Sequence, residues 1–89
     1  MEIQFSFVTD EKAVDFCNKI ITIMINHFHI SEKEALGRIN RQWENNGDFV
    51  GLDIRYHELT EYWAYLIYYG DGTYYWYKDK EKLTPIPFP

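Results

Sequence analysis

The sequence predicts a small α+β domain, in which an αα-hairpin and a third short helix pack on an antiparallel β-sheet of two or three strands. Two long segments carry apolar residues at helical spacing, and other segments alternate apolar and polar residues as strands do. With 89 residues, 46% of them hydrophobic, the chain is long enough for one modest core. We therefore expect a single domain over residues 1–89.

The amino-terminal segment, MEIQFSFV at residues 1–8, alternates and is interpreted as a half-buried strand that could also merge with the next helix. Thr9 or Asp10 is the expected N-cap of a helix that runs to about His29. The apolar face of this helix is wide, which predicts packing against more than one element. One of its two apolar stripes consists of Val14, Cys17, Ile21, Met24 and Phe28.

A second helix is predicted directly after the first, because SEKE at residues 31–34 is a capping box. The two helices would then form an αα-hairpin. Gly37 lies inside the second helix, where glycine costs about 1 kcal/mol relative to alanine, and this indicates close contact with a neighbour. Gly47 is the expected left-handed cap. The inner face is expected to consist of Leu36, Ile39 and Trp43.

The remaining elements are shorter. Residues 48–58 are interpreted as a short strand or an extended loop, because Leu52, Ile54 and Tyr56 alternate. A third helix is predicted from about Thr60 to Tyr69.

Two further segments follow the third helix. TYYWYK at residues 73–78 is prone to β-structure and predicts a strand. LTPIPFP at residues 83–89 favours an extended path. We expect this tail to fold back on nearby tyrosines, although it could also dock in an aromatic groove of a partner.

Charge and cysteine content restrict the classes of partner and the compartment. The net charge is −5 and the lysines and arginines are scattered, which disfavours nucleic-acid binding and suits a basic protein partner. Cys17 is the single cysteine, as is usual in a reducing cytoplasm. The first residues do not resemble a signal peptide, and the longest apolar run, IITIMI, is too short for a membrane span. We expect a cytoplasmic protein that binds no membrane.

Aromatic residues are concentrated between Glu61 and Tyr77, where nine of seventeen positions carry rings. A small core cannot hold all of them, so we expect Trp63, Leu66, Ile67 and Trp76 inside, joined by Trp43. Tyrosines outside the core would form a binding face, because tyrosine is common at binding hot spots. The alternative is that they line a shallow core with their hydroxyls in water. The tyrosines expected outside are Tyr65, Tyr68, Tyr75 and Tyr77.

No motif in the sequence specifies catalysis, a cofactor or a metal. His27 and His29 are two apart on a helix and do not face each other, so we predict no metal site. No serine or cysteine lies in a nucleophile motif. His57 beside Glu58 is a weak acid/base candidate, because neighbours in a strand point to opposite faces. We predict no enzyme activity and no cofactor.

Three segments together resemble a group of small uncharacterised bacterial proteins. They are HISEKEALGRINRQW, YHELTEYWAYLIYYG and YYWY, followed by the proline-rich end. Small acidic proteins of this kind are similar to immunity proteins, which neutralise a partner toxin, so the resemblance implies a protein partner. The matching polar positions could pair with one another to fix the fold, or face that partner. These positions are Arg38, Asn40, His57 and Glu58.

We therefore predict a non-enzymatic protein-binding module. In its immunity-like form, this module would bind a basic toxin. Its predicted binding residues are the four outer tyrosines together with those four matching polar positions. Two alternatives stay open. One is a small ligand-binding or enzymatic domain that uses His57, Glu58 and nearby tyrosines. The other is a structural protein that forms a homodimer through the tyrosine face.

Overall fold

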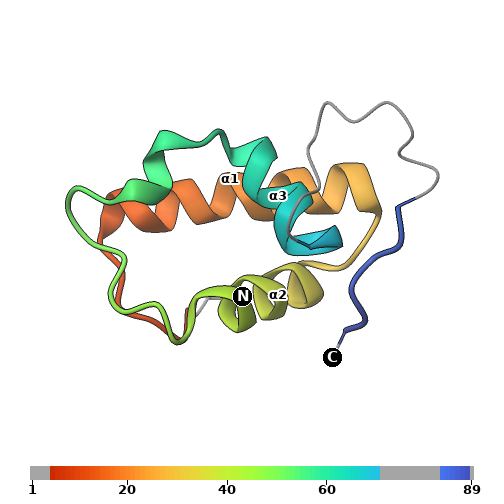
Figure 1. The fold of residues 1–89 in the computed structure, drawn as a ribbon, viewed down its shortest axis with the longest axis horizontal. Helices are drawn as coiled ribbons and strands as arrows, with labels where there is room; N and C mark the ends of the chain where they lie inside the picture. The colour runs from red at the N-terminus through yellow and green to blue at the C-terminus, as the bar shows by residue number, and fades with distance from the viewer. Residues whose placement is uncertain (1–4, 71–82, 89) are drawn as a thin grey trace.

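The computed structural model describes residues 5–70 and 83–88, and these residues form a helical fold. The elements, in order, are α1 (Glu11–Phe28), α2 (Glu32–Trp43), the short 3₁₀ helix η1 (Ile54–His57) and α3 (Thr60–Tyr69). α1 runs along the length of the molecule, and α2 returns below it in the view of Figure 1. α3 packs mainly against α1 and also contacts α2, so the three helices share one core.

The three predicted helices are present, and local capping explains where α1 and α2 begin. The Asp10 side chain accepts a hydrogen bond from the backbone N–H of Ala13 at 2.9 Å, which starts α1. Ser31 Oγ accepts from the N–H of Glu34 at 3.0 Å and starts α2. Between them, His29 ends α1 in the left-handed region, with φ 57°. α2 ends at Trp43, before the predicted cap, although Gly47 has the predicted left-handed backbone with φ 77°.

The predicted α+β class with an antiparallel β-sheet is wrong. In the described residues, strand-type pairing is limited to one parallel bridge between Thr9 and Phe49. The N–H of Phe49 donates to the carbonyl of Val8 at 2.8 Å in this bridge. The third predicted strand, residues 73–78, lies outside the described residues, as do residues 1–4 of the first. The fold that the structure shows is all-helical.

The described part of the first predicted strand is an extended segment that lies across α2. Phe7 is buried and meets Trp43 edge to face, with ring centroids 6.0 Å apart. The N–H of Ser6 donates to Asn40 Oδ1 at 2.9 Å, where a strand would use a backbone carbonyl. The alternation is therefore real, but it serves packing on a helix and not a sheet ladder.

Of the two alternatives for residues 48–58, a short strand or an extended loop, the strand is wrong because a side chain turns the backbone. Asp53 Oδ1 accepts from the N–H of Arg55 at 2.9 Å, and the chain coils into η1. Of the three alternating residues, only Tyr56 packs against the core. Leu52 and Ile54 point into solvent. An alternating pattern thus arises here without a common buried face.

The core lies between the three helices and the segments that cross their ends. No helix in residues 5–70 or 83–88 is long and apolar enough to cross a membrane. The core contains aliphatic side chains from α1 and aromatic side chains from α2 and the loop that follows it. Its buried members are Phe7, Ala13, Cys17, Ile20, Ile21, Met24, Ala35, Ile39, Trp43, Phe49, Ala64, Leu66 and Ile67.

Cys17 provides a direct test of this core. Its side chain is fully buried on α1, and burial raises the pKa of its thiol to about 12. Because the thiolate is the reactive form, we expect the native protein to resist a disulfide reagent such as DTNB at mildly alkaline pH. The same protein should react completely in denaturing guanidinium chloride. Rapid, stoichiometric reaction under native conditions would show that α1 is packed differently.

Candidate protein-docking site

Three of the predicted binding residues lie close together where α3 meets the end of α1 and the side of α2, and two of them are buried. Tyr65 is 5% exposed, so its expected exposure is wrong, and its hydroxyl lies 3.3 Å from His27 Nδ1. The half-buried Tyr68 stacks on Phe28 at 4.0 Å between ring centroids. Arg38 is 4% exposed, with its guanidinium 4.7 Å from the centre of the Tyr68 ring.

The other predicted residues lie elsewhere. Asn40 holds the amino-terminal segment through Ser6. His57 and Glu58 are exposed at the end of η1, and the structure does not bring them together with Arg38 or Asn40. Tyr75 and Tyr77 lie outside the described residues. The predicted set therefore does not form one surface in the described part of the chain.

The most exposed large apolar side chains in the described residues belong to the loop between α2 and α3. Leu52 is 98% exposed and Ile54 is 81% exposed. We call these two residues the apolar ridge. Single exposed aliphatic residues are common on protein surfaces, so exposure alone would carry little weight. What distinguishes the ridge is how firmly its backbone is held.

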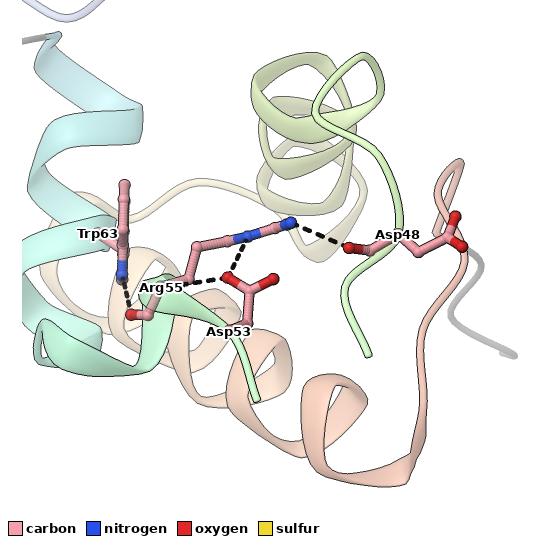
Figure 2. Close-up of polar contacts among 4 residues, drawn as sticks. All are labelled: Asp48, Asp53, Arg55 and Trp63. Atoms are coloured by element: carbon pink, nitrogen blue, oxygen red, sulfur yellow. Dashed lines mark hydrogen bonds and ion pairs between the residues drawn. The ribbon is translucent and has the colours of Figure 1, made fainter. Parts of the chain in front are cut away.

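Arg55 anchors the loop that carries the ridge, through the hydrogen bonds drawn in Figure 2. Its Nε donates to Asp53 Oδ1 at 2.9 Å, and its Nη2 donates to the carbonyl of Asp48 at 3.3 Å. Its own carbonyl accepts from Trp63 Nε1 on α3 at 2.8 Å. The side chain and the carbonyl of Arg55 thus connect the start of the loop, the ridge and α3.

The Arg55 side chain is 8% exposed and forms an ion pair with the similarly buried Asp53. Aromatic rings cover the guanidinium. The ring centre of Phe49 lies 4.1 Å from Arg55 Cζ, and that of Trp43 lies 5.1 Å away. The loop is therefore fixed to the core through a buried charge whose hydrogen-bond geometry is specific.

Asp10 anchors the other side of the loop. While one oxygen caps α1, the second accepts from the backbone N–H of Gly51 at 2.7 Å. The Gly51 hydrogen bond, with that of Ala13, lowers the pKa of Asp10. Gly51 has φ 62°, which side chains rarely adopt. The backbone immediately before Leu52 is therefore held in a turn that favours glycine.

Two open hollows flank the ridge and share Leu52, Asp53 and Ile54 as lining residues. The first has a volume of about 630 Å³, and its floor includes the half-buried Tyr56 with the Lys12 ammonium 4.4 Å from the ring centre. The second, of about 650 Å³, is lined by polar groups and by two tryptophan rings. Its further lining residues are Gln42, Trp43, Asn45, Asn46, Asp48, Arg55 and Trp63.

This arrangement suits contact with a protein. Two apolar side chains protrude from a held loop, and each hollow beside them has both apolar and hydrogen-bonding walls. His57 lines the first hollow together with Tyr56, but Glu58 does not. In residues 5–70 and 83–88 there is no cluster of three or more His, Cys, Asp or Glu that could hold a metal ion.

The ridge was missed in the sequence because its residues fit a strand pattern equally well. The local signal that could have indicated it is Asp53 two residues before Arg55, since an aspartate that accepts from the backbone two positions on starts a turn. Gly51 just before the ridge is a second turn signal. Together they favour a bend with its side chains outward over a strand.

Comparisons of the chain with protein-family models, with curated proteins and with solved structures found no match.

Proposed function

We propose that this chain is a non-enzymatic protein-binding module that docks a basic protein partner through the apolar ridge. The observation that carries the proposal is the exposure of Leu52 and Ile54 on a loop that Arg55 and Asp10 hold in place. A loop held in one shape loses little conformational entropy when it binds. Exposed apolar side chains rimmed by polar groups are typical of protein-interaction sites.

The expected gain from covering the ridge is large enough for specific binding. Full burial of an aliphatic side chain of this size contributes about 1.5–3 kcal/mol. Leu52 and Ile54 stand almost fully in solvent, so each can contribute most of that amount to a complex. The hollows on both sides would receive partner side chains around these two anchors. This is the usual distribution of energy in an interface, where few residues dominate.

Charge favours a basic partner. The whole chain carries a net charge of −5. Near the ridge, Asp48 is exposed and lines the second hollow. A further hollow, which shares Lys12 with the first, is lined by Asp10, Glu11 and Asp15. Acidic groups around an apolar anchor would attract a basic protein at long range and speed its association.

The narrower form of the proposal is an immunity-like role, in which the basic partner is a toxin. It is supported by the resemblance of three sequence segments and by the acidic charge. A cytoplasmic location is part of the same proposal, supported by the single, buried cysteine.

A photo-crosslinking leucine analogue at position 52, which keeps an aliphatic side chain there, tests the proposal in the organism that encodes the chain. The matched control carries the same residue at position 33, which is exposed on α2 and lines none of the hollows beside the ridge. We expect position 52 to capture one protein that position 33 does not. That protein must then bind the chain at a one-to-one ratio when both are purified. Equal capture at both positions, or no complex between the purified proteins, would contradict the proposal.

The purified pair also tests the charge of the partner. We expect the affinity to fall as ionic strength rises from about 0.01 M to 0.15 M, because the Debye length shortens from about 30 Å to 8 Å over this range. Most of the change should appear in the association rate. Stopped-flow or surface plasmon resonance measurements give both rates. An association rate that does not depend on salt would contradict the proposal that the partner is basic. The proposal that the ridge docks a protein would still stand.

A further inference from the structure

On another part of the molecule, the carboxyl-terminal segment packs against α2 and the end of α3, and we call the surface that it covers the α2–α3 groove. Residues 83–88 form no helix or strand and run past the α1–α2 connection toward α2 (Figure 1). Two main-chain groups of the segment are held. The N–H of Ile86 donates to the carbonyl of Tyr68 at 2.9 Å. Arg41 Nη1 donates to the carbonyl of Pro87 at 3.0 Å. The segment is thus bound as an extended peptide ligand would be.

Two apolar side chains of the segment lie against glycines, and at Gly37 the missing Cβ makes room for the ring. A Cβ on Gly37 would overlap the tip of the Phe88 ring, so the ring rests directly on the α2 backbone. A Cβ on Gly70 would lie 3.4 Å from Ile86 Cδ1, which places Ile86 in contact with the end of α3. The close contact that Gly37 indicated in the sequence is therefore contact with the tail.

Two arginines of α2 lie over the Phe88 ring. The guanidinium carbons of Arg41 and Arg38 lie 5.2 Å and 5.4 Å from its centre. Arg38 is also held by residues outside the tail. Its Nε donates to Glu34 Oε2 at 2.8 Å, and its guanidinium lies over the Tyr68 ring. The groove is therefore built by the helices themselves.

From these contacts we propose that the α2–α3 groove is a binding site for an extended Ile-Pro-Phe segment, and that the same residues of a second copy of the chain can fill it. The occupant is named by the structure, because this segment is seated in the groove and every copy carries it. Exchange of an identical element is a low-cost route to association. This inference does not depend on the docking ridge.

The covalent connection between the tail and its own groove decides which copy of the tail fills the groove. A segment on the same chain competes at an effective concentration in the millimolar range. The native chain at micromolar concentration therefore keeps its own tail bound, and exchange between copies becomes important only as the protein concentration approaches that range. This competition is removed when one variant keeps only a working groove and another keeps only a working tail.

Two single substitutions achieve that separation in the full chain. Phe88→Ala leaves the groove intact but removes the ring that fills it. Gly37→Ala fills the groove, keeps Phe88, and favours the helical state of α2 because alanine is the better helix former. Each variant alone is expected to be monomeric. An equimolar mixture should form heterodimers, in which the Gly37→Ala chain supplies the tail and the Phe88→Ala chain supplies the groove.

Sedimentation velocity on the separate variants and on the mixture measures this complementation. A labelled LTPIPF peptide gives a second readout. We expect it to bind the Phe88→Ala chain with a Kd below about 0.1 mM and at least about tenfold more tightly than it binds the native chain, whose own tail competes at about 1 mM. It should shift the amide NMR signals of Arg38 and Gly70.

Matched controls locate the interaction. The peptide LTPIPA should not bind, and the double variant Gly37→Ala/Phe88→Ala should lose the LTPIPF site. The inference is overturned if the mixed variants stay monomeric and the peptide binds the Phe88→Ala chain no better than the double variant. Tight peptide binding to the native chain would also overturn it, because its own segment would then not occupy the groove. Binding of LTPIPF and LTPIPA with equal affinity would do the same, because Phe88 would not be the anchor.

Discussion

Replacement of Arg55 by alanine is expected to lower the free energy of unfolding by about 3–5 kcal/mol. The reason is that the substitution removes the counterion of the buried Asp53 carboxylate, which then keeps only its hydrogen bond from the backbone N–H of residue 55, and this costs far more than the ion pair contributes in net terms. It also removes the cation that covers the Phe49 and Trp43 rings and leaves the Asp48 carbonyl without its donor. Urea or guanidinium denaturation measures the loss.

Arg41→Ala is the matched control for this prediction. Arg41 is the same residue type but is exposed on α2, and its hydrogen bond goes to the Pro87 carbonyl and not to a buried carboxylate, so its removal should change the free energy of unfolding by less than about 1 kcal/mol. Because a small domain has only about 5–15 kcal/mol of stability in total, the difference between the two variants is easy to resolve. A loss below about 1 kcal/mol for Arg55→Ala would show that the guanidinium does not anchor the loop.

The largest effect on binding is expected from truncation of the ridge. Leu52→Ala or Ile54→Ala should weaken the complex with the purified partner by about 30-fold or more, which corresponds to a hot-spot loss of about 2 kcal/mol. The stability of the free chain should change by less than about 0.5 kcal/mol, because both side chains are in solvent before binding. Isothermal titration calorimetry and denaturation curves on the same preparations separate the two effects.

Leu59→Ala is the control for the ridge. Leu59 is a half-exposed aliphatic side chain from the same region, but it lines neither hollow. Its truncation should leave the Kd within about threefold of the native value, as is usual for residues outside the central hot spot. If Leu59→Ala weakens the complex as much as Leu52→Ala, the binding energy does not come from the ridge.

The helices could be predicted from the sequence because their signals are local. Asp10 and Ser31 accept the hydrogen bonds that N-caps provide, and the apolar spacing between them is helical. The end of α2 was placed too late: Gly47 is left-handed as predicted, but the helix already ends at Trp43 and does not use Gly47 as its cap. Glu44, which follows, still has right-handed helical backbone angles.

The sheet could not be predicted correctly because alternation does not specify what a segment pairs with. Phe5 and Phe7 alternate with polar residues, but they pack on helices and on each other, with ring centroids 5.5 Å apart. In the loop, the choice between strand and turn depends on one carboxylate, that of Asp53. Interactions of this kind override the intrinsic strand preference of aliphatic residues.

The candidate site was the least predictable part. Tyr65 was expected outside, yet α3 buries four successive residues, 64–67, because other parts of the chain cover it on more than one side. Leu52 and Ile54 are outside because Arg55, seven residues from Asp48, draws the loop inward around its own guanidinium. Neither outcome follows from local periodicity. The tyrosine face at Tyr75 and Tyr77 stays a prediction.

The central claim is that a partner covers the loop of the apolar ridge. Amide hydrogen exchange of the chain, alone and in complex with the purified partner, tests it most directly. We predict that new protection is strongest in residues 48–57 and weak on the exposed face of α2. Protection confined to α2 and α3, with residues 48–57 exchanging as in the free chain, would contradict the claim.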